Sequence, residues 1–195
     1  ALAFANDTKT YINNKYSLSL ELAEGEIISA HIDMIKAAFT SAFPMEASMP
    51  QILEESIYRC YQKKGWDTDR NIFNGYEKDF PIMSDLLAEV KSVVQSKGFG
   101  DRLQSEYTGS LVSRLSNLTV GAKGSMLNCK YSTDFEYIAE NNVILEMEEL
   151  KSPEDKSLFM GFILSRLSSV IKKKHRKLLT VEEIREIYQN GGWHW

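Results

Sequence analysis

The hydrophobic and polar positions of this chain repeat with two different periods, which separate its candidate strands from its candidate helices. Residues 16–22 alternate polar and apolar side chains, and this period of two predicts a strand with one buried face. Over residues 26–43 the apolar positions recur at spacings of three and four, which predicts a helix that Pro44 ends. A similar stripe over residues 48–65 predicts a second helix, packed against the first as a hairpin.

Two further helices and two loops are predicted in the middle of the chain. Residues 66–80 mix aspartate, asparagine, glycine and aromatic residues without a period, which predicts a surface loop anchored by its aromatic side chains. Helical spacing resumes over residues 84–98 and again over residues 101–118. Glycines then interrupt the pattern, so we expect residues 121–125 to form a turn or loop.

The last third of the chain predicts a strand followed by helices. Residues 142–148 are rich in branched apolar side chains, which is typical of a buried or half-buried strand. Ser152 and Pro153 then supply an N-cap and a first helical residue. Apolar side chains cover most of the circumference over residues 158–171, so this helix should be deeply buried, and its last turn, 172–177, is basic.

A final helix is predicted from Thr180, where Glu183 completes a capping box, to a pair of glycines near the end of the chain. Together the patterns indicate an α/β fragment that is mostly helical, with about six helices and two short strands. We expect a single domain over residues 1–195. Its parts are a strand at 16–22, a helical segment at 26–118, and a strand with C-terminal helices at 143–195.

Composition narrows the class of protein. Hydrophobic residues make up 43% of the 195 residues, enough to fill a core, and 23 Lys and Arg against 27 Asp and Glu disfavour a generally basic nucleic-acid-binding surface. Cys60 and Cys129 cannot by themselves form a zinc site or a disulfide framework, which favours a reducing, cytoplasmic location. No apolar run is long enough to span a bilayer. The chain starts without methionine, so we expect it to be part of a larger protein.

Motifs that carry a specific chemistry are scarce. The segment 121–125, which contains Lys123, is the nearest imitation of a phosphate-binding loop, but its spacing differs and a flexible turn is the alternative. The histidines have no metal-ligand spacing and no hydrolase nucleophile elbow is present, so neither a metal nor nucleophilic catalysis is expected. Glu146, Glu148 and Glu149 lie at a strand end, where α/β proteins bind nucleotides or metals; a solvated strand end is the alternative.

Basic residues close the long helix that begins at Pro153. Lys172, Lys173, Lys174, Arg176 and Lys177 are candidates for contacts with a DNA backbone, because each neutralised phosphate releases counterions. The alternative is a solubilising run at a helix C-terminus, where cations interact favourably with the helix dipole.

A series of short segments follows a characteristic order between residues 26 and 175. They are His31-Ile32-Asp33 through Phe39, Phe43-Pro44-Met45, Met49 to Tyr58, Lys64 to Asp67, Phe80-Pro81, Ser84 to Leu87, Arg114-Leu115 with Leu118, Gly121 with Lys123-Gly124, Met126 and Asn128, and Val143 to Leu150 followed by Phe159-Met160. In this order they resemble HerA-like ATPases of the HerA/FtsK superfamily of DNA translocases. The resemblance implies a helical part of a RecA-like P-loop ATPase lobe, located between the phosphate-binding loop and the Walker B strand.

The resemblance also implies where the chemistry of the parent protein resides. The phosphate-binding loop would precede this chain, so the chain alone should lack turnover and a cofactor, while the intact parent would use ATP and Mg²⁺. Glu182 and Glu183 fall near the Glu-Glu pair of the family's Walker B strand, although Ile184-Arg185 replaces the family's Ala-His; a helix cap is the alternative. Arg114 is a candidate for an arginine that acts on a neighbouring subunit's nucleotide, or is an ordinary helix-surface arginine.

The implied function is that of the middle segment of an ATP-dependent DNA translocase or helicase. The implied partners are the remainder of the ATPase chain, further subunits of a homo-oligomeric ring, DNA and a partner nuclease, with no membrane. The alternative is a non-enzymatic helical protein-interaction module whose resemblance reflects only its packing pattern. A Gly-x-x-x-x-Gly-Lys-Ser/Thr motif upstream in the parent gene would favour the translocase.

Overall fold

The computed structural model describes residues 2–5, 9–12, 17–46, 48–148, 150–177 and 185, and the side chains of 17–46, 48–148, 150–174 and 185. Most of these residues are helical. In chain order the elements are β1 (Leu2–Ala5), β2 (Lys9–Ile12), α1 (Ile28–Ala42), α2 (Met49–Lys63), β3 (Trp66–Asp67), β4 (Ile72–Phe73), α3 (Met83–Ser96), α4 (Asp101–Tyr107), a π-helical turn (Thr108–Val112), α5 (Ser113–Leu118), α6 (Gly121–Leu127), α7 (Phe135–Glu140), β5 (Val143–Leu145) and α8 (Pro153–Lys177).

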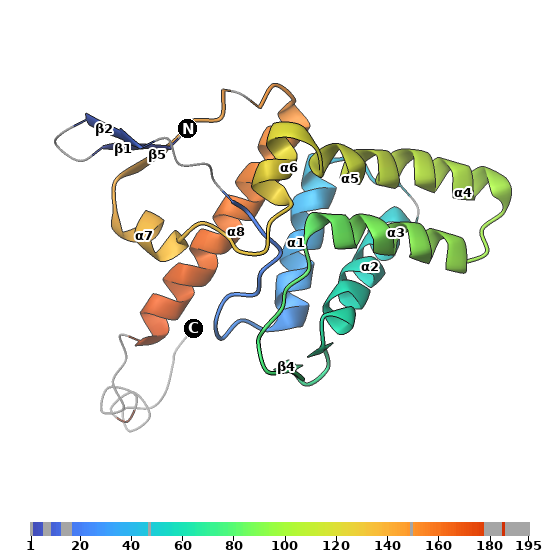
Figure 1. The fold of residues 1–195 in the computed structure, drawn as a ribbon, viewed down its shortest axis with the longest axis horizontal. Helices are drawn as coiled ribbons and strands as arrows, with labels where there is room; N and C mark the ends of the chain where they lie inside the picture. Colours follow the sequence, from blue (N-terminus) through green and yellow to red (C-terminus); the bar gives the residue numbers. More distant parts are fainter. Residues whose placement is uncertain are drawn as a thin grey trace.

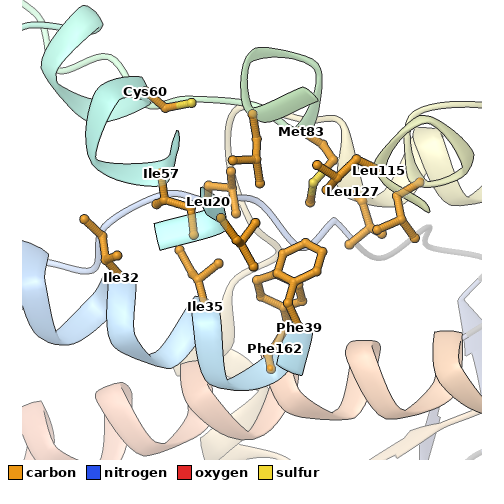
Figure 2. Close-up of a cluster of buried hydrophobic side chains, with 14 of the residues drawn as sticks. Leu20, Ile32, Ile35, Phe39, Ile57, Cys60, Met83, Leu115, Leu127 and Phe162 are labelled. Atoms are coloured by element: carbon orange, nitrogen blue, oxygen red, sulfur yellow. The ribbon is translucent and has the colours of Figure 1, made fainter. Parts of the chain in front are cut away.

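The main hydrophobic core lies among α1, α2, α3, α5, α6 and α8 (Figure 1). Figure 2 shows aliphatic and aromatic side chains from these helices pointing toward one another. Phe39 of α1 and Phe162 of α8 meet edge to face, with ring centroids 5.9 Å apart. Near them Gly161 allows α8 to approach α1 closely, because an added Cβ would lie 2.9 Å from the Cβ of Ala38. Full burial of each large side chain stabilises the fold by roughly 1.5–3 kcal/mol, so this core holds the helices together.

The helix predictions for the first 118 residues are confirmed, because α1, α2, α3 and the run from α4 to α5 lie within a few residues of the expected ends. The predicted start of α8 at Pro153 is also confirmed. The hydroxyl of Ser152 accepts a hydrogen bond from the N–H of Asp155 at 3.3 Å and so caps this helix. The apolar stripes that predicted these helices therefore correspond to the faces that the helices bury in the core.

The prediction of a strand at 16–22 is wrong for the described residues, which are extended but belong to no sheet. The alternation itself is real, since every second side chain is buried: Leu18, Leu20 and Leu22. The N–H groups of Ser17 and Ser19 donate to the hydroxyls of Thr133 and Ser132, at 2.9 and 3.0 Å. A ladder needs successive backbone partners on one neighbouring strand, whereas here hydroxyls satisfy these two groups and the N–H of Leu18 donates to the carbonyl oxygen of Met126. The segment runs through the core (Figure 2).

Residues 121–125 form the greater part of helix α6, so the prediction of a turn or loop there is wrong. Gly121 has φ 61°, in the left-handed region that favours glycine. At Gly124 an added Cβ would lie 2.3 Å from the carbonyl oxygen of Thr119. The two glycines thus permit a tight turn from α5 into α6, and they were misread as helix breakers because glycine also favours loops.

The region 66–80 is mainly a loop, as predicted, with a short pairing of β3 with β4. The ring of Trp66 stacks on Phe80 at 5.4 Å between centroids and contacts Phe73 at 5.2 Å. Aromatic side chains therefore anchor the loop. No sequence pattern predicted α7, which begins where the carboxylate of Asp134 accepts hydrogen bonds from two N–H groups of the first turn.

Strand β5 confirms the predicted strand at 142–148 only over Val143–Leu145. It belongs to an antiparallel sheet with the order β2-β1-β5, at one side of the helices (Figure 1). No pattern predicted β1 or β2. The structure as described is thus mostly helical, with short strands at its periphery.

Helix α8 is buried on one face only, so the prediction of deep burial holds in part. Leu158, Phe159, Phe162 and Ile163 face the core. Leu164 and Ile171, in contrast, are 58% and 59% exposed. In the described part of the chain no helix, α8 included, combines the length and apolarity needed to cross a membrane.

Candidate functional site

A cavity of about 550 Å³ lies between α6, the loop that follows β5, and the first half of α8. Its walls are mainly apolar and come from four separate parts of the chain. They include Leu18, Met126, Leu145, Met147, Phe159 and Ile163. β5 ends and α8 begins at this cavity, and its volume lies within the range of small-molecule binding pockets.

An ion pair joins two walls of the cavity. Nζ of Lys123 on α6 lies 2.9 Å from Oδ2 of Asp155 on α8, and Asp155 is only 7% exposed. The positive charge of Lys123 is therefore neutralised by an acid of the same chain. Removal of one partner from such a pair leaves the other charge uncompensated, so the pair holds α6 against α8.

The acids that follow β5 show no metal-binding arrangement. Glu146 and Glu148 are exposed, with Glu146 at the cavity wall, and Glu149 lies outside the described residues. Among the residues that the structure describes, no three His, Cys, Asp or Glu side chains are grouped so that they could hold a metal ion. The exposure of Glu146 and Glu148 agrees with the interpretation of a solvated strand end.

Arg114 connects α5 to the end of α1. Its Nη1 donates a hydrogen bond to the carbonyl oxygen of Pro44 at 2.6 Å, and its guanidinium carbon lies 5.6 Å from the centroid of the Phe43 ring. Both contacts are favourable, the second because a cation is attracted to an aromatic face. Arg114 therefore has a role within this fold, and its action on a neighbouring subunit's nucleotide stays a prediction.

Two lysines of the basic cluster are paired with acids of the same chain. Nζ of Lys173 lies 2.9 Å from carboxylate oxygens of both Glu24 and Glu136, and Nζ of Lys174 lies 3.2 Å from Oε1 of Glu140. Hydrogen bonds with Glu24 and Glu136 raise the pKa of Lys173 to about 12. Charges paired in this way attract a phosphate backbone less strongly than free ones, which favours the interpretation of a helix-end surface.

The other sequence candidates are less well placed by the structure. Lys172 is exposed on α8. The side chains of Arg176 and Lys177 lie outside the described residues, as do Glu182 and Glu183 entirely. Their contacts with DNA, the Walker B-like role and the alternative helix cap all stay predictions.

A buried polar network fixes the extended segment, and no sequence pattern predicted it. Arg166 of α8 is 8% exposed and donates through Nη2 to the carbonyl oxygen of Glu21 and, at 3.3 Å, to the hydroxyl of Ser132. The hydroxyl of Tyr61 donates to the carbonyl oxygen of Leu20. Partners so distant in the sequence leave no local spacing signal, and only the fold brings them together.

Glu26 and His31 extend this network at the start of α1. Nδ1 of His31 lies 3.2 Å from Oε2 of Glu26, and the hydroxyl of Ser169 donates to Oε1 of Glu26 at 2.9 Å. Burial alone would raise the pKa of Glu26, but the hydrogen bonds and the charge of His31 outweigh it and hold this pKa below the ordinary value. The carboxylate therefore stabilises the fold in its ionised form.

Comparison of the chain with models of known protein families finds no match, and neither curated proteins nor solved structures show a significant match. Any function assigned to the chain thus rests on its sequence segments and on the geometry of its cavity.

Proposed function

We propose that this chain is the middle segment of a HerA-like ATP-dependent DNA translocase or helicase, where it forms a helical part of a RecA-like lobe. One observation carries the proposal: segments that resemble the family, although distant in the sequence, meet at the same cavity. Gly121, Lys123 and Met126 of one such segment form one wall, and Leu145 and Met147 of another form the next. A likeness that arose only from helical packing would not require the segments to share a site.

The relation between β5 and α8 also supports the proposal. Glu140, just before β5, pairs with Lys174 near the end of α8. At the other end, Leu145 of β5 shares the cavity with Asp155 near the start of α8. Strand and helix therefore run in opposite directions, as in the strand–helix units of an α/β lobe, although the described sheet that contains β5 is antiparallel.

The cavity itself does not fit a nucleoside triphosphate, because its walls are mainly apolar and Lys123 is paired with Asp155. In the proposed parent, ATP and Mg²⁺ would be held by a phosphate-binding loop outside this chain. Glu182 and Glu183 would serve the Walker B position, and Arg114 a neighbouring subunit. The other proposed partners are the remaining ATPase chain, a homo-oligomeric ring, DNA and a partner nuclease, in the cytoplasm.

The test compares the chain with the product of its complete gene. The coding sequence upstream should encode Gly-x-x-x-x-Gly-Lys-Ser/Thr, and the complete protein should hydrolyse Mg²⁺-ATP at a rate that duplex DNA increases. The 195-residue chain should show no turnover under the same conditions. A lysine-to-alanine change in the upstream motif is the matched control, and it should abolish hydrolysis without unfolding the protein.

Two results would overturn the proposal. One is a complete gene without the upstream motif, and the other is a complete protein that binds and hydrolyses no ATP. Either result would favour the alternative function, a helical protein-interaction module, whose partner would then be sought with the complete protein.

A further inference from the structure

The cavity between α6 and α8 has an apolar floor that reaches the hydrophobic core. Leu18, Phe159 and Ile163 belong to its lining, although these residues are only 1%, 1% and 5% exposed. The lining also contains Glu146 and Lys151, and both of these residues are exposed. The cavity is therefore a pocket whose floor is apolar and whose rim, at the protein surface, is polar.

Water is a poor occupant of this floor. A buried water typically makes about three hydrogen bonds, and the floor side chains offer no polar atom. Lys123 and Asp155, which also line the cavity, bind each other at 2.9 Å. Because poorly held water is displaced favourably by an apolar group, the floor favours the apolar part of a ligand.

The size of the cavity and the chemistry of its floor favour a small molecule over a polypeptide segment. The volume of about 550 Å³ lies within the range of pockets that hold small ligands. A polypeptide segment would bring backbone N–H and C=O groups against the apolar floor, where they would lose their hydrogen bonds to water and find no partner. A small molecule with an apolar body carries no such groups, so it is the occupant that fits.

The charges around the cavity select an uncharged ligand. In the described part of the chain the charged residues of the lining are two lysines and two acids, namely Lys123, Lys151, Glu146 and Asp155. Their formal charges cancel, so neither an anion nor a cation gains a net attraction that would offset its loss of water. The exposed side chain of Asn117, also in the lining, can hydrogen-bond to an uncharged polar group at the rim.

We propose that this cavity binds a neutral amphiphile, whose apolar body fills the floor and whose uncharged polar end stays at the rim, as a medium-chain alcohol would. The site goes beyond the translocase function proposed above, because it uses neither ATP nor Mg²⁺ and lies within the described part of this chain.

Displacement of a fluorescent probe from the 195-residue chain tests the proposal. The probe is uncharged N-phenylnaphthylamine, whose fluorescence rises in apolar surroundings. The competitors are decanol, decanoate and decylammonium, each below the concentration at which it forms micelles. Decanol should displace the probe at a concentration about tenfold or more below that of either charged molecule. Octanol should bind roughly fifteenfold more weakly than decanol, because each buried CH₂ contributes about 0.8 kcal/mol.

A pair of tryptophan variants tests whether binding takes place in this cavity. Ala122 lines the cavity, so the indole of Ala122→Trp should occupy it and weaken decanol binding about tenfold or more. Ser125→Trp is the matched control, because Ser125 is exposed on the same helix and is not part of the lining, and it should leave binding within about twofold. Binding by both variants is measured from the rise in Tm with decanol, which does not depend on tryptophan fluorescence.

The outcomes separate this proposal from the proposed function. A preference for decanol that Ala122→Trp weakens and Ser125→Trp retains supports the site. No displacement by decanol, equal displacement by the charged molecules, or unchanged binding by Ala122→Trp would each overturn it. If Ala122→Trp does not fold, the comparison of neutral and charged ligands on the wild type still decides. ATP hydrolysis by the complete protein, in contrast, judges only the translocase proposal.

Discussion

The tight turn into α6 makes Gly124 the position where the smallest substitution should have the largest effect. In Gly124→Ala the new Cβ would lie 2.3 Å from the carbonyl oxygen and 2.5 Å from the carbonyl carbon of Thr119. Both obstructing atoms are backbone, so relief requires a shift of α6 or of the end of α5. Overpacking of a well-packed site typically costs 1–3 kcal/mol, and contacts this short indicate a loss of about 3 kcal/mol.

Thermal unfolding followed by circular dichroism measures this loss. At this chain length about 3 kcal/mol lowers Tm by roughly 6–12 °C. The matched control is Gly109→Ala, because an added Cβ at Gly109 meets no atom within 4 Å. Alanine is the better helix former, so the control should leave Tm unchanged or raise it slightly. A Tm of Gly124→Ala within about 1 °C of the wild type would refute the close contact and, with it, the placement of α6 on the cavity.

Three further experiments test other contacts. The pKa of Glu26 lies below its ordinary value, so its contribution to stability is complete above about pH 4.5 and is lost as the pH falls through the folded-state pKa. Urea unfolding of Glu26→Gln should therefore depend less on pH below that point than the wild type does, and identical pH profiles would contradict the pairing. Tyr61→Phe removes one donor to the buried carbonyl of Leu20, which also lies 3.4 Å from Nε2 of His31, and should cost about 1 kcal/mol in urea, so an unchanged midpoint would speak against this bond. A double-mutant cycle of Lys123→Met and Asp155→Asn should give a coupling of about 1 kcal/mol, and additive effects would show that the ion pair does not form.

The contrast between α1 and the extended segment shows what a pattern can and cannot predict. Apolar spacing predicted α1 because the stripe and the backbone hydrogen bonds of a helix both lie within one segment. The alternation of Leu18 and Leu20 correctly predicted their burial. It did not predict whether a neighbouring backbone or the hydroxyls of Ser132 and Thr133 would satisfy the N–H groups.

The candidate site was less predictable than the fold. Lys123 belongs to a glycine-rich segment and Asp155 to the first turn of α8, and no spacing in the sequence links the two. Their pairing requires the turn at Gly121 to direct α6 toward α8. Arg114 was a candidate for contact with another subunit, and the fold shows that its guanidinium also binds the carbonyl of Pro44.

The sequence by itself determined α1 to α5, the start of α8 and most of their buried faces, because periodicity and caps act over one or two turns, but it did not determine α6 or α7. Only the tertiary structure decided that α6, the loop after β5 and α8 enclose a cavity, and that Lys123 meets Asp155 on its wall. It also decided which groups form hydrogen bonds with the backbone of the extended segment. These outcomes depend on contacts between residues far apart in the chain, which form only when the hydrophobic core brings the helices together.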